Sequence, residues 1–219
     1  MNTSTTVLGT DEKKLLNEAA EWHLLSCLFS CPGPGWRERV EKLSQEIGDA
    51  TLRATAEQAV AEATEGLYHS VFGPGGPAPP REASHDNCIQ LGQLLSELAA
   101  YYDAFAYRPA TEEVLDHVAV EVGFIAYLRL KQAYALANAD PEHAATAAEA
   151  AQNFIVEHLS AIAAPLASAL EQFRVQYLAD AAAALARRVG PPRHSPGTAA
   201  PFTEPDGEGC AHDCGLPEP

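Results

Sequence analysis

Apolar positions recur at helical spacing along most of the chain, and no segment alternates apolar and polar residues long enough to form a convincing strand. Asp140 followed by Pro141 is a good helix start, because proline at the first helical position loses no needed N–H. Thr10 or Asp11 can cap the first helix. The pattern predicts helices over residues 10–30, 36–47, 49–65, 87–106, 111–137, 141–158, 160–172 and 174–188.

Two segments break this pattern. Residues 67–85, "LYHSVFGPGGPAPPREASH", have five prolines and glycines within 73–77, which excludes regular structure there. After Val189 the sequence becomes rich in proline, glycine and acidic residues, a composition that buries too little apolar surface to offset chain entropy. The sequence therefore predicts an all-α, single-domain bundle of about seven to eight helices over 1–189, a long Pro/Gly loop, and a flexible tail over 190–219.

The segment 112–130, "EEVLDHVAVEVGFIAYLRL", is expected to form one central helix, capped by Thr111 and apolar on nearly every side. Its first two turns nevertheless contain Asp116, His117 and Glu121. On a helix, His117 and Glu121 fall on one stripe, and Asp116 lies about 100 degrees round from His117. These three groups are expected either to form hydrogen bonds at the edge of the core or to face a ligand.

Charge and composition exclude several classes of function. With 14 Lys and Arg against 30 Asp and Glu, the formal net charge is −16, which repels nucleic acid and anionic membrane surfaces. No run of roughly 18 to 20 uninterrupted apolar residues is present, and the N-terminal residues do not resemble a secretory signal. Five cysteines at irregular spacing do not resemble a disulfide framework. We therefore expect a cytoplasmic protein that binds neither nucleic acid nor membrane.

Metal binding is the alternative. His117 and Glu121, spaced i and i+4, could form half of a site, but no second half is visible. In the tail, Cys210, His212 and Cys214 supply three soft ligands, one short of a structural zinc site. No phosphate-binding loop or nucleophile elbow is present, and this shifts weight from catalysis toward binding.

Several segments together resemble the TorD/DmsD/NarJ-like redox-enzyme maturation chaperones, over most of residues 11–190. "LYHSVFGPGGPAPPREAS" resembles the family's Tyr-x-x-x-Phe loop with its proline and Glu-x-Ser. "EEVLDHVAVEVGFIAYL" resembles its Asp-His helix, and "FIVEHLSAIAAPLASAL" its His-Leu helix. Two positions depart from the family pattern: Arg81 replaces an aromatic residue before Glu-x-Ser, and no proline precedes Asp116.

The resemblance implies an all-helical assembly chaperone without enzymatic activity or cofactor. Its partner would be the catalytic subunit of a molybdenum oxidoreductase of the dimethyl sulfoxide reductase family, or that subunit's N-terminal leader, often a twin-arginine signal. Monomer and homodimer both stay open. The residues that the resemblance and the charge pattern assign to peptide binding are Asp116, His117, Glu121, Phe72, Pro74, Glu82 and Ser84.

Overall fold

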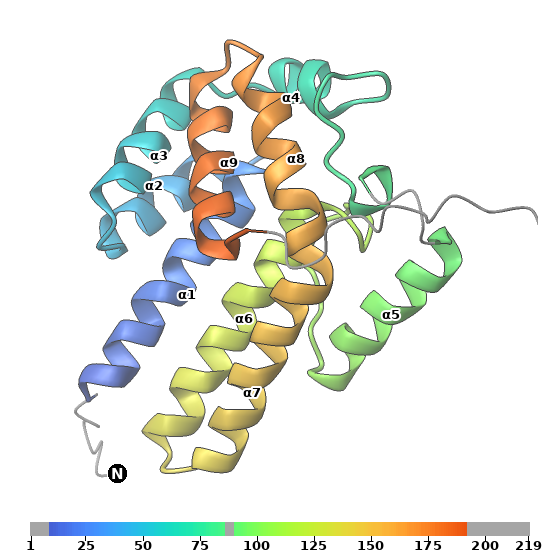
Figure 1. Ribbon diagram of the computed structural model, residues 1–219. Helices are drawn as coiled ribbons and strands as arrows, with labels where there is room; N and C mark the ends of the chain where they lie inside the picture. Colours follow the sequence, from blue (N-terminus) through green and yellow to red (C-terminus); the bar gives the residue numbers. More distant parts are fainter. Residues whose placement is uncertain (1–8, 86–89, 192–219) are drawn as a thin grey trace, which may run out of the picture.

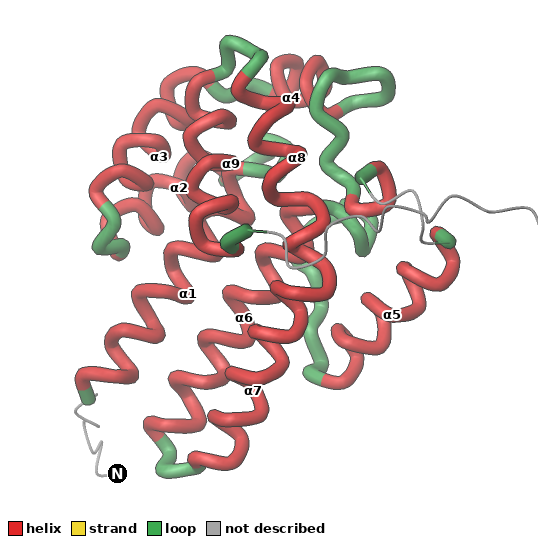
Figure 2. Tube along the Cα trace, viewed as in Figure 1, coloured by secondary structure: helices red, strands yellow, loops and turns green. Residues whose placement is uncertain are grey.

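The computed structural model describes residues 9–85 and 90–191, and within these ranges every regular element is helical (Figure 1, Figure 2). This confirms the predicted all-α fold class. The first five α-helices are α1 (Thr10–Leu28), α2 (Trp36–Glu46), α3 (Ala50–Glu62), α4 (Glu65–Phe72) and α5 (Leu91–Ala104). The 3-10 turn η1 (Glu82–Ser84) lies between α4 and α5. The remaining elements are α6 (Val118–Ala137), α7 (Pro141–Phe154), the π turn η2 (Ile155–Leu159), α8 (Ser160–Glu171) and α9 (Gln176–Val189).

The helices pack in two connected groups (Figure 1). In the first, α6 lies between α1 and α7. In the second, α2 packs against α1 and α3, and α9 packs against α3 and α8. The buried side chains of both groups form one hydrophobic cluster, in which Phe29, Phe124 and Tyr177 are among the largest fully buried residues. α5 stands at the edge of the assembly and contributes Leu94, Leu98 and Tyr102 to the buried set.

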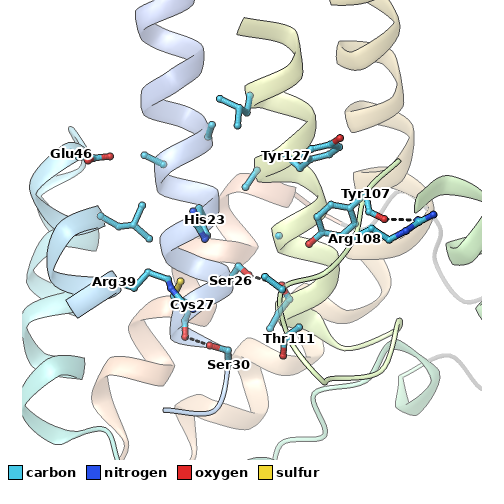
Figure 3. Close-up of a pocket in the computed structure, with 18 of the residues that line it drawn as sticks. His23, Ser26, Cys27, Ser30, Arg39, Glu46, Tyr107, Arg108, Thr111 and Tyr127 are labelled. Atoms are coloured by element: carbon cyan, nitrogen blue, oxygen red, sulfur yellow. Dashed lines mark hydrogen bonds between the residues drawn. The ribbon is translucent and has the colours of Figure 1, made fainter. Parts of the chain in front are cut away.

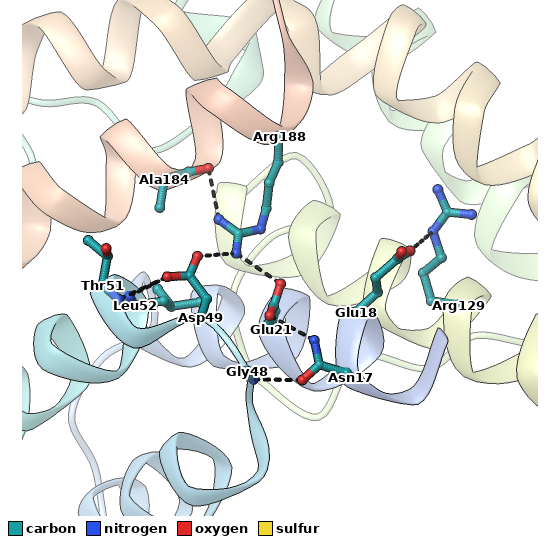
Figure 4. Close-up of polar contacts among 10 residues, drawn as sticks. All are labelled: Asn17, Glu18, Glu21, Gly48, Asp49, Thr51, Leu52, Arg129, Ala184 and Arg188. Atoms are coloured by element: carbon teal, nitrogen blue, oxygen red, sulfur yellow. Dashed lines mark hydrogen bonds and ion pairs between the residues drawn. The ribbon is translucent and has the colours of Figure 1, made fainter. Parts of the chain in front are cut away.

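A polar contact ties α9 to α1 and α3 (Figure 4). One guanidinium nitrogen of Arg188 donates to Glu21 at 3.0 Å and to Asp49 at 2.9 Å. Asp49 also caps α3, because its side chain accepts the backbone N–H groups of Thr51 and Leu52. The last turn of α9 is therefore fixed to the start of α3 and the middle of α1.

The structure contains one helix, α4, that was not predicted. The helix expected over 49–65 ends at Glu62, and Thr64 caps a new helix, α4, by accepting the N–H of Leu67. The expectation of irregular structure from residue 67 is therefore wrong as far as Phe72. Its physical reason is that Pro74, the first proline of the segment, lies beyond this helix and does not interrupt it.

The central helix starts later than expected. α6 begins at Val118, so the prediction of a helix capped by Thr111 is wrong, and Asp116 and His117 precede the helix. The backbone of this segment pairs with the loop instead: Glu82 N–H donates to the carbonyl of Asp116 at 2.9 Å. These tertiary hydrogen bonds outweigh the helix propensity of the sequence.

α7 and α8 form one continuous helix through the π turn, where a break near residue 159 was expected. By length and composition this helix, Pro141–Glu171, is apolar enough to cross a membrane, although 44% of its most apolar window is buried in the protein. It packs against α6 and α9. A buried core helix satisfies the same length and composition criterion, so the match is weak evidence for a membrane span.

The predicted C-terminal tail lies almost entirely outside the described residues, and so do Cys210, His212 and Cys214. Gly190 ends α9 with a positive φ of 81°, a conformation that glycine adopts without steric cost.

Candidate functional site

Asp116 is sealed inside the protein by Arg81. Its side chain is 0% exposed, and Arg81 Nε donates to both carboxylate oxygens, at 3.0 and 3.1 Å. A second guanidinium nitrogen lies 2.9 Å from Oδ1. Arg81, which departs from the family pattern in sequence, is thus the bidentate partner of Asp116.

The same loop segment is fixed by its backbone. Val118 N–H donates to the carbonyl of Pro80 at 2.8 Å, and an isolated antiparallel bridge pairs Arg81 with His117. We call residues 73–85 the Pro/Gly loop. Its second half is therefore held against the start of α6 by both main-chain and side-chain contacts.

His117 caps α6 and begins a hydrogen-bonded series that leads to the surface. Its Nδ1 accepts the backbone N–H of Ala119 at 3.1 Å, so the proton of the neutral ring lies on Nε2. Nε2 lies 3.1 Å from the hydroxyl of Tyr68, which donates to Glu113 Oε1 at 2.8 Å. Burial lowers the pKa of His117, which keeps the ring neutral, and burial with the bond to Glu113 raises the pKa of Tyr68.

Behind this series lies a buried group of titratable residues. Glu82 Oε2 is 3.2 Å from Nδ1 of His158, which belongs to the π turn, and both side chains are at most 3% exposed. Glu121 is fully buried beside them. Within the described residues neither carboxylate oxygen of Glu121 has a hydrogen-bond partner. Burial, together with the nearby charges of Glu82 and Asp116, raises the pKa of Glu121 well above its usual value, so Glu121 is held as a neutral acid.

A pocket of about 480 Å³ lies beside the Pro/Gly loop. Its walls are Tyr68, His69 and Phe72 of α4, loop residues 73–76, 79–81 and Ser84, and Glu113, Val114 and His117 before α6. We call it the loop pocket. Glu113 is the carboxylate in its wall, and its side chain is 27% exposed. The pocket thus combines apolar rings and prolines with one accessible negative charge.

A second concavity, of about 510 Å³, lies between α1, α2 and α6 (Figure 3). We call it the α1–α6 groove. Leu16, Leu43 and Leu130 supply apolar lining, and Arg39 and Arg108 supply positive charge. Helices α1 and α6 approach closely here because α6 carries a glycine. A Cβ on Gly123 would lie 2.7 Å from the Tyr107 hydroxyl and 3.0 Å from Ser26 Oγ.

One connection separates the two concavities. Tyr107, Arg108, Ala110 and Thr111 line the α1–α6 groove. Glu113, Val114 and His117 line the loop pocket. A ligand that occupies both concavities would therefore contact this connection.

The structure divides the seven residues predicted for peptide binding into two sets. Phe72, Pro74, Ser84 and His117 line the loop pocket. The three acids, Asp116, Glu82 and Glu121, are buried behind it, and the first two are paired with Arg81 and His158. Four residues that complete this region were not predicted as site residues from the sequence: Tyr68, Arg81, Glu113 and His158. The sequence does contain a signal for Glu113, because it lies four positions before His117, a spacing that brings two side chains close together on a helix.

Metal-ligating side chains converge elsewhere. Within residues 9–85 and 90–191, the group of three or more such side chains with mutually close ligand atoms is Cys31, Glu65 and His69, and it includes neither His117 nor Glu121. Both ring nitrogens of His117 are engaged in hydrogen bonds. The alternative of a metal site at His117 and Glu121 therefore has no support in this geometry.

The described helices share their arrangement with a solved structure. A crystal structure described as a candidate redox enzyme maturation protein from Archaeoglobus fulgidus matches with a TM-score of 0.52 and 19% sequence identity. The match covers 86% of this chain and 99% of that one. The fold therefore places the chain in the class of all-helical proteins to which that structure belongs.

The family follows from the sequence match. Residues 34–168, more than half of the chain, match the family model described as nitrate reductase delta subunit. The chain belongs to this family of NarJ/TorD-type chaperones, which confirms the resemblance found in the sequence. It is a redox-enzyme maturation chaperone and not an enzyme. No curated protein matches the chain.

Proposed function

We propose that this chaperone acts in the cytoplasm on the catalytic subunit of a molybdenum-containing oxidoreductase of the dimethyl sulfoxide reductase family. It binds the N-terminal leader, the subunit itself, or both, before cofactor insertion and export. The observation that carries the proposal is the loop pocket, which gathers Phe72, Pro74, Ser84 and His117 around the accessible carboxylate of Glu113.

The chemistry of this pocket suits a basic peptide start. A twin-arginine leader has a basic segment followed by an apolar stretch, so its receptor needs a carboxylate beside an apolar surface. Glu113 supplies that carboxylate, and Tyr68 and His117 orient it through the hydrogen-bonded series. The positive charge of Arg81, in the same wall, is balanced by Asp116.

Asp116 takes a different role from the one expected from sequence. Both of its oxygens face Arg81, so it positions the loop and does not contact an arginine of the leader. Glu82 acts in the same way, since its contact with His158 holds η1 against the π turn. Asp116 and Glu82 are positioning residues behind the pocket, Glu121 is buried beside them, and Glu113 is the binding carboxylate.

The apolar stretch of the leader fits the α1–α6 groove. Leu16, Leu43 and Leu130 in that groove favour an apolar segment, and its charged lining residues, Arg39, Glu46 and Arg108, are of mixed sign. Because the connection 107–117 borders both concavities, the basic start lies in the loop pocket while the apolar stretch lies in the groove.

Titration of the full chain with a fluorescently labelled leader peptide of the client tests this proposal. Glu113→Gln should weaken binding by about 10- to 100-fold, the range expected for a hydrogen bond to a charged group. Glu112→Gln is the matched control, because Glu112 is exposed, carries the same charge and does not line the pocket. It should change affinity by less than about twofold.

A second set of variants separates the two concavities. Phe72→Ala should weaken the intact leader, and Leu130→Glu should weaken it only while its apolar stretch is present. Exchanging the leader's arginines for glutamine should remove the effect of Glu113→Gln, as a double-mutant cycle requires for a direct contact. Unchanged affinity in both Glu113→Gln and Phe72→Ala would place the leader elsewhere on the chaperone.

A further inference from the structure

Cys31, Glu65 and His69 lie together at one end of α4. One ligand atom from each, the thiol sulfur, a carboxylate oxygen and a ring nitrogen, all lie within 4.8 Å of one another. We propose that these three side chains form a binding site for a borderline divalent cation, with Zn²⁺ as its natural probe. This inference does not rest on the leader-binding proposal.

Two anchored segments bring these side chains together. Glu65 and His69 are one turn apart on α4, which places them on the same face, with His69 Nε2 3.7 Å from Glu65 Oε1. Cys31 follows the end of α1. There the backbone N–H of Gly33 donates a hydrogen bond to the Cys31 carbonyl at 2.8 Å. Trp36 Nε1 donates to the Cys27 carbonyl at 2.7 Å, which fixes the chain that leaves α1.

The ligand types suit such a cation. Thiolate, imidazole and carboxylate are the protein ligands of zinc, and three of them leave one coordination position open. In a tetrahedron with zinc bonds of about 2.0–2.3 Å, ligand atoms are roughly 3.3–3.8 Å apart. The separation of up to 4.8 Å must therefore shrink by rotation of side chains. Glu65 and His69 are 73% and 59% exposed, so their side chains have room to rotate.

The local charge also favours a cation. A carboxylate oxygen of Glu65 lies within 4.8 Å of the Cys31 sulfur, so a thiolate there would be repelled by the carboxylate. A divalent cation reverses this effect, because it neutralises the carboxylate and stabilises the thiolate as a ligand.

The position of the site gives the open coordination position a use. His69 is both a member of the group and part of the wall of the loop pocket. A cation held there lies at the rim of that pocket, where water or a thiol or carboxylate of a bound partner can complete its coordination shell.

The chain contains two controls. His143 and Asp140 form an exposed histidine–carboxylate pair at 2.6 Å, also within one helical turn, so they match Glu65 and His69 without the thiol. Cys210, His212 and Cys214 offer a competing thiol set, which the double variant Cys210→Ser/Cys214→Ser removes.

The experiment is a Co²⁺ titration of the full-length, chelator-treated double tail variant, followed by thiolate-to-cobalt charge-transfer absorption. Zn²⁺ competition then gives the affinity. We expect one equivalent of Co²⁺ to produce the band and Cys31→Ser to abolish it. His69→Asn should weaken binding at least about 10-fold, whereas His143→Asn should leave it unchanged. Far-UV circular dichroism checks the fold of each variant, and exposed Glu65→Gln provides a second variant if Cys31→Ser does not fold.

Any of three results would overturn the proposal. The first is a charge-transfer band that disappears when only the tail cysteines are replaced, which would place the thiol ligands in the tail. The second is a band that persists in Cys31→Ser, and the third is an equal effect of His69→Asn and His143→Asn on affinity.

Discussion

The guanidinium of Arg81 binds both carboxylate oxygens of Asp116 and so joins the Pro/Gly loop to the residue pair that precedes α6. The two partners differ in environment, since the side chain of Arg81 is 38% exposed and that of Asp116 is 0% exposed. This asymmetry decides what happens when either partner is removed.

Removing the arginine should cost more stability than removing the acid. Arg81→Ala leaves a buried carboxylate without its counter-ion, which costs about 3–5 kcal/mol. Asp116→Asn leaves an arginine that can turn toward water, and should cost about 1–3 kcal/mol. Urea unfolding near neutral pH measures both.

An exposed ion pair provides the control for this comparison. Arg108 and Asp103, at 2.8 Å, are 73% and 70% exposed, so Arg108→Ala should cost at most about 1 kcal/mol. If Asp116→Asn proved as costly as Arg81→Ala, the burial of the carboxylate would not be the deciding factor.

Replacement of His117 should separate its capping role from its contact with Tyr68. Asparagine is a strong helix cap and can accept the N–H of Ala119 in place of Nδ1. His117→Ala should therefore destabilise the protein by about 1–2 kcal/mol more than His117→Asn. The difference in free energy of unfolding between the two variants measures the cap, and equal stabilities would argue against it.

Glu121→Gln should make the protein relatively more stable as the pH rises. Burial raises the folded-state pKa of Glu121 above its ordinary value of 4.5. Above that value the unfolded chain releases the proton while the folded chain keeps it, so the folded state loses stability with rising pH. Glutamine stays neutral in both states and removes this loss.

The measurement for Glu121 is a comparison of unfolding free energies across the pH range. The variant's advantage over the unmodified protein should be smallest below pH 4.5 and grow as the pH rises above that value. The contribution of His117 is present in both proteins and cancels. A difference that stays constant with pH would mean that Glu121 ionises in the folded protein.

Arg188→Ala should loosen α9 from α1 and α3. The change removes hydrogen bonds to Glu21 and Asp49 and leaves two partly buried carboxylates side by side, at a cost of about 1–3 kcal/mol. Arg187 is the neighbouring exposed arginine, and Arg187→Ala should stay within about 0.5 kcal/mol of the unmodified protein. Hydrogen exchange of the α9 amides should increase in the first variant only.

Local signals predicted most helices of this fold. Asp140 caps α7 as expected, with Pro141 at its first position, and α2 and α8 agree with their predicted ranges to within a residue or two. These features depend on residues that are neighbours in sequence, which is why the pattern alone indicates them.

Non-local contacts explain what the sequence pattern missed. The late start of α6 depends on the backbone of residues 80–82, and the role of Arg81 depends on Asp116, 35 positions away. The π turn positions His158 against Glu82, 76 positions away. Helical periodicity contains no information about such distant partners. The sequence pattern therefore did not indicate that Arg81 pairs with Asp116 or that His158 pairs with Glu82.

The π turn at Ile155–Leu159 joins the two helix groups of the chaperone through one continuous helix. Its wider winding shifts the angular phase of the helix, so α7 faces α6 while α8 faces α9, and a single rod spans both helix groups. His158 is part of that wider turn and contacts Glu82. A tilt of this continuous helix would therefore displace His158 and, through it, Glu82 at the end of the Pro/Gly loop.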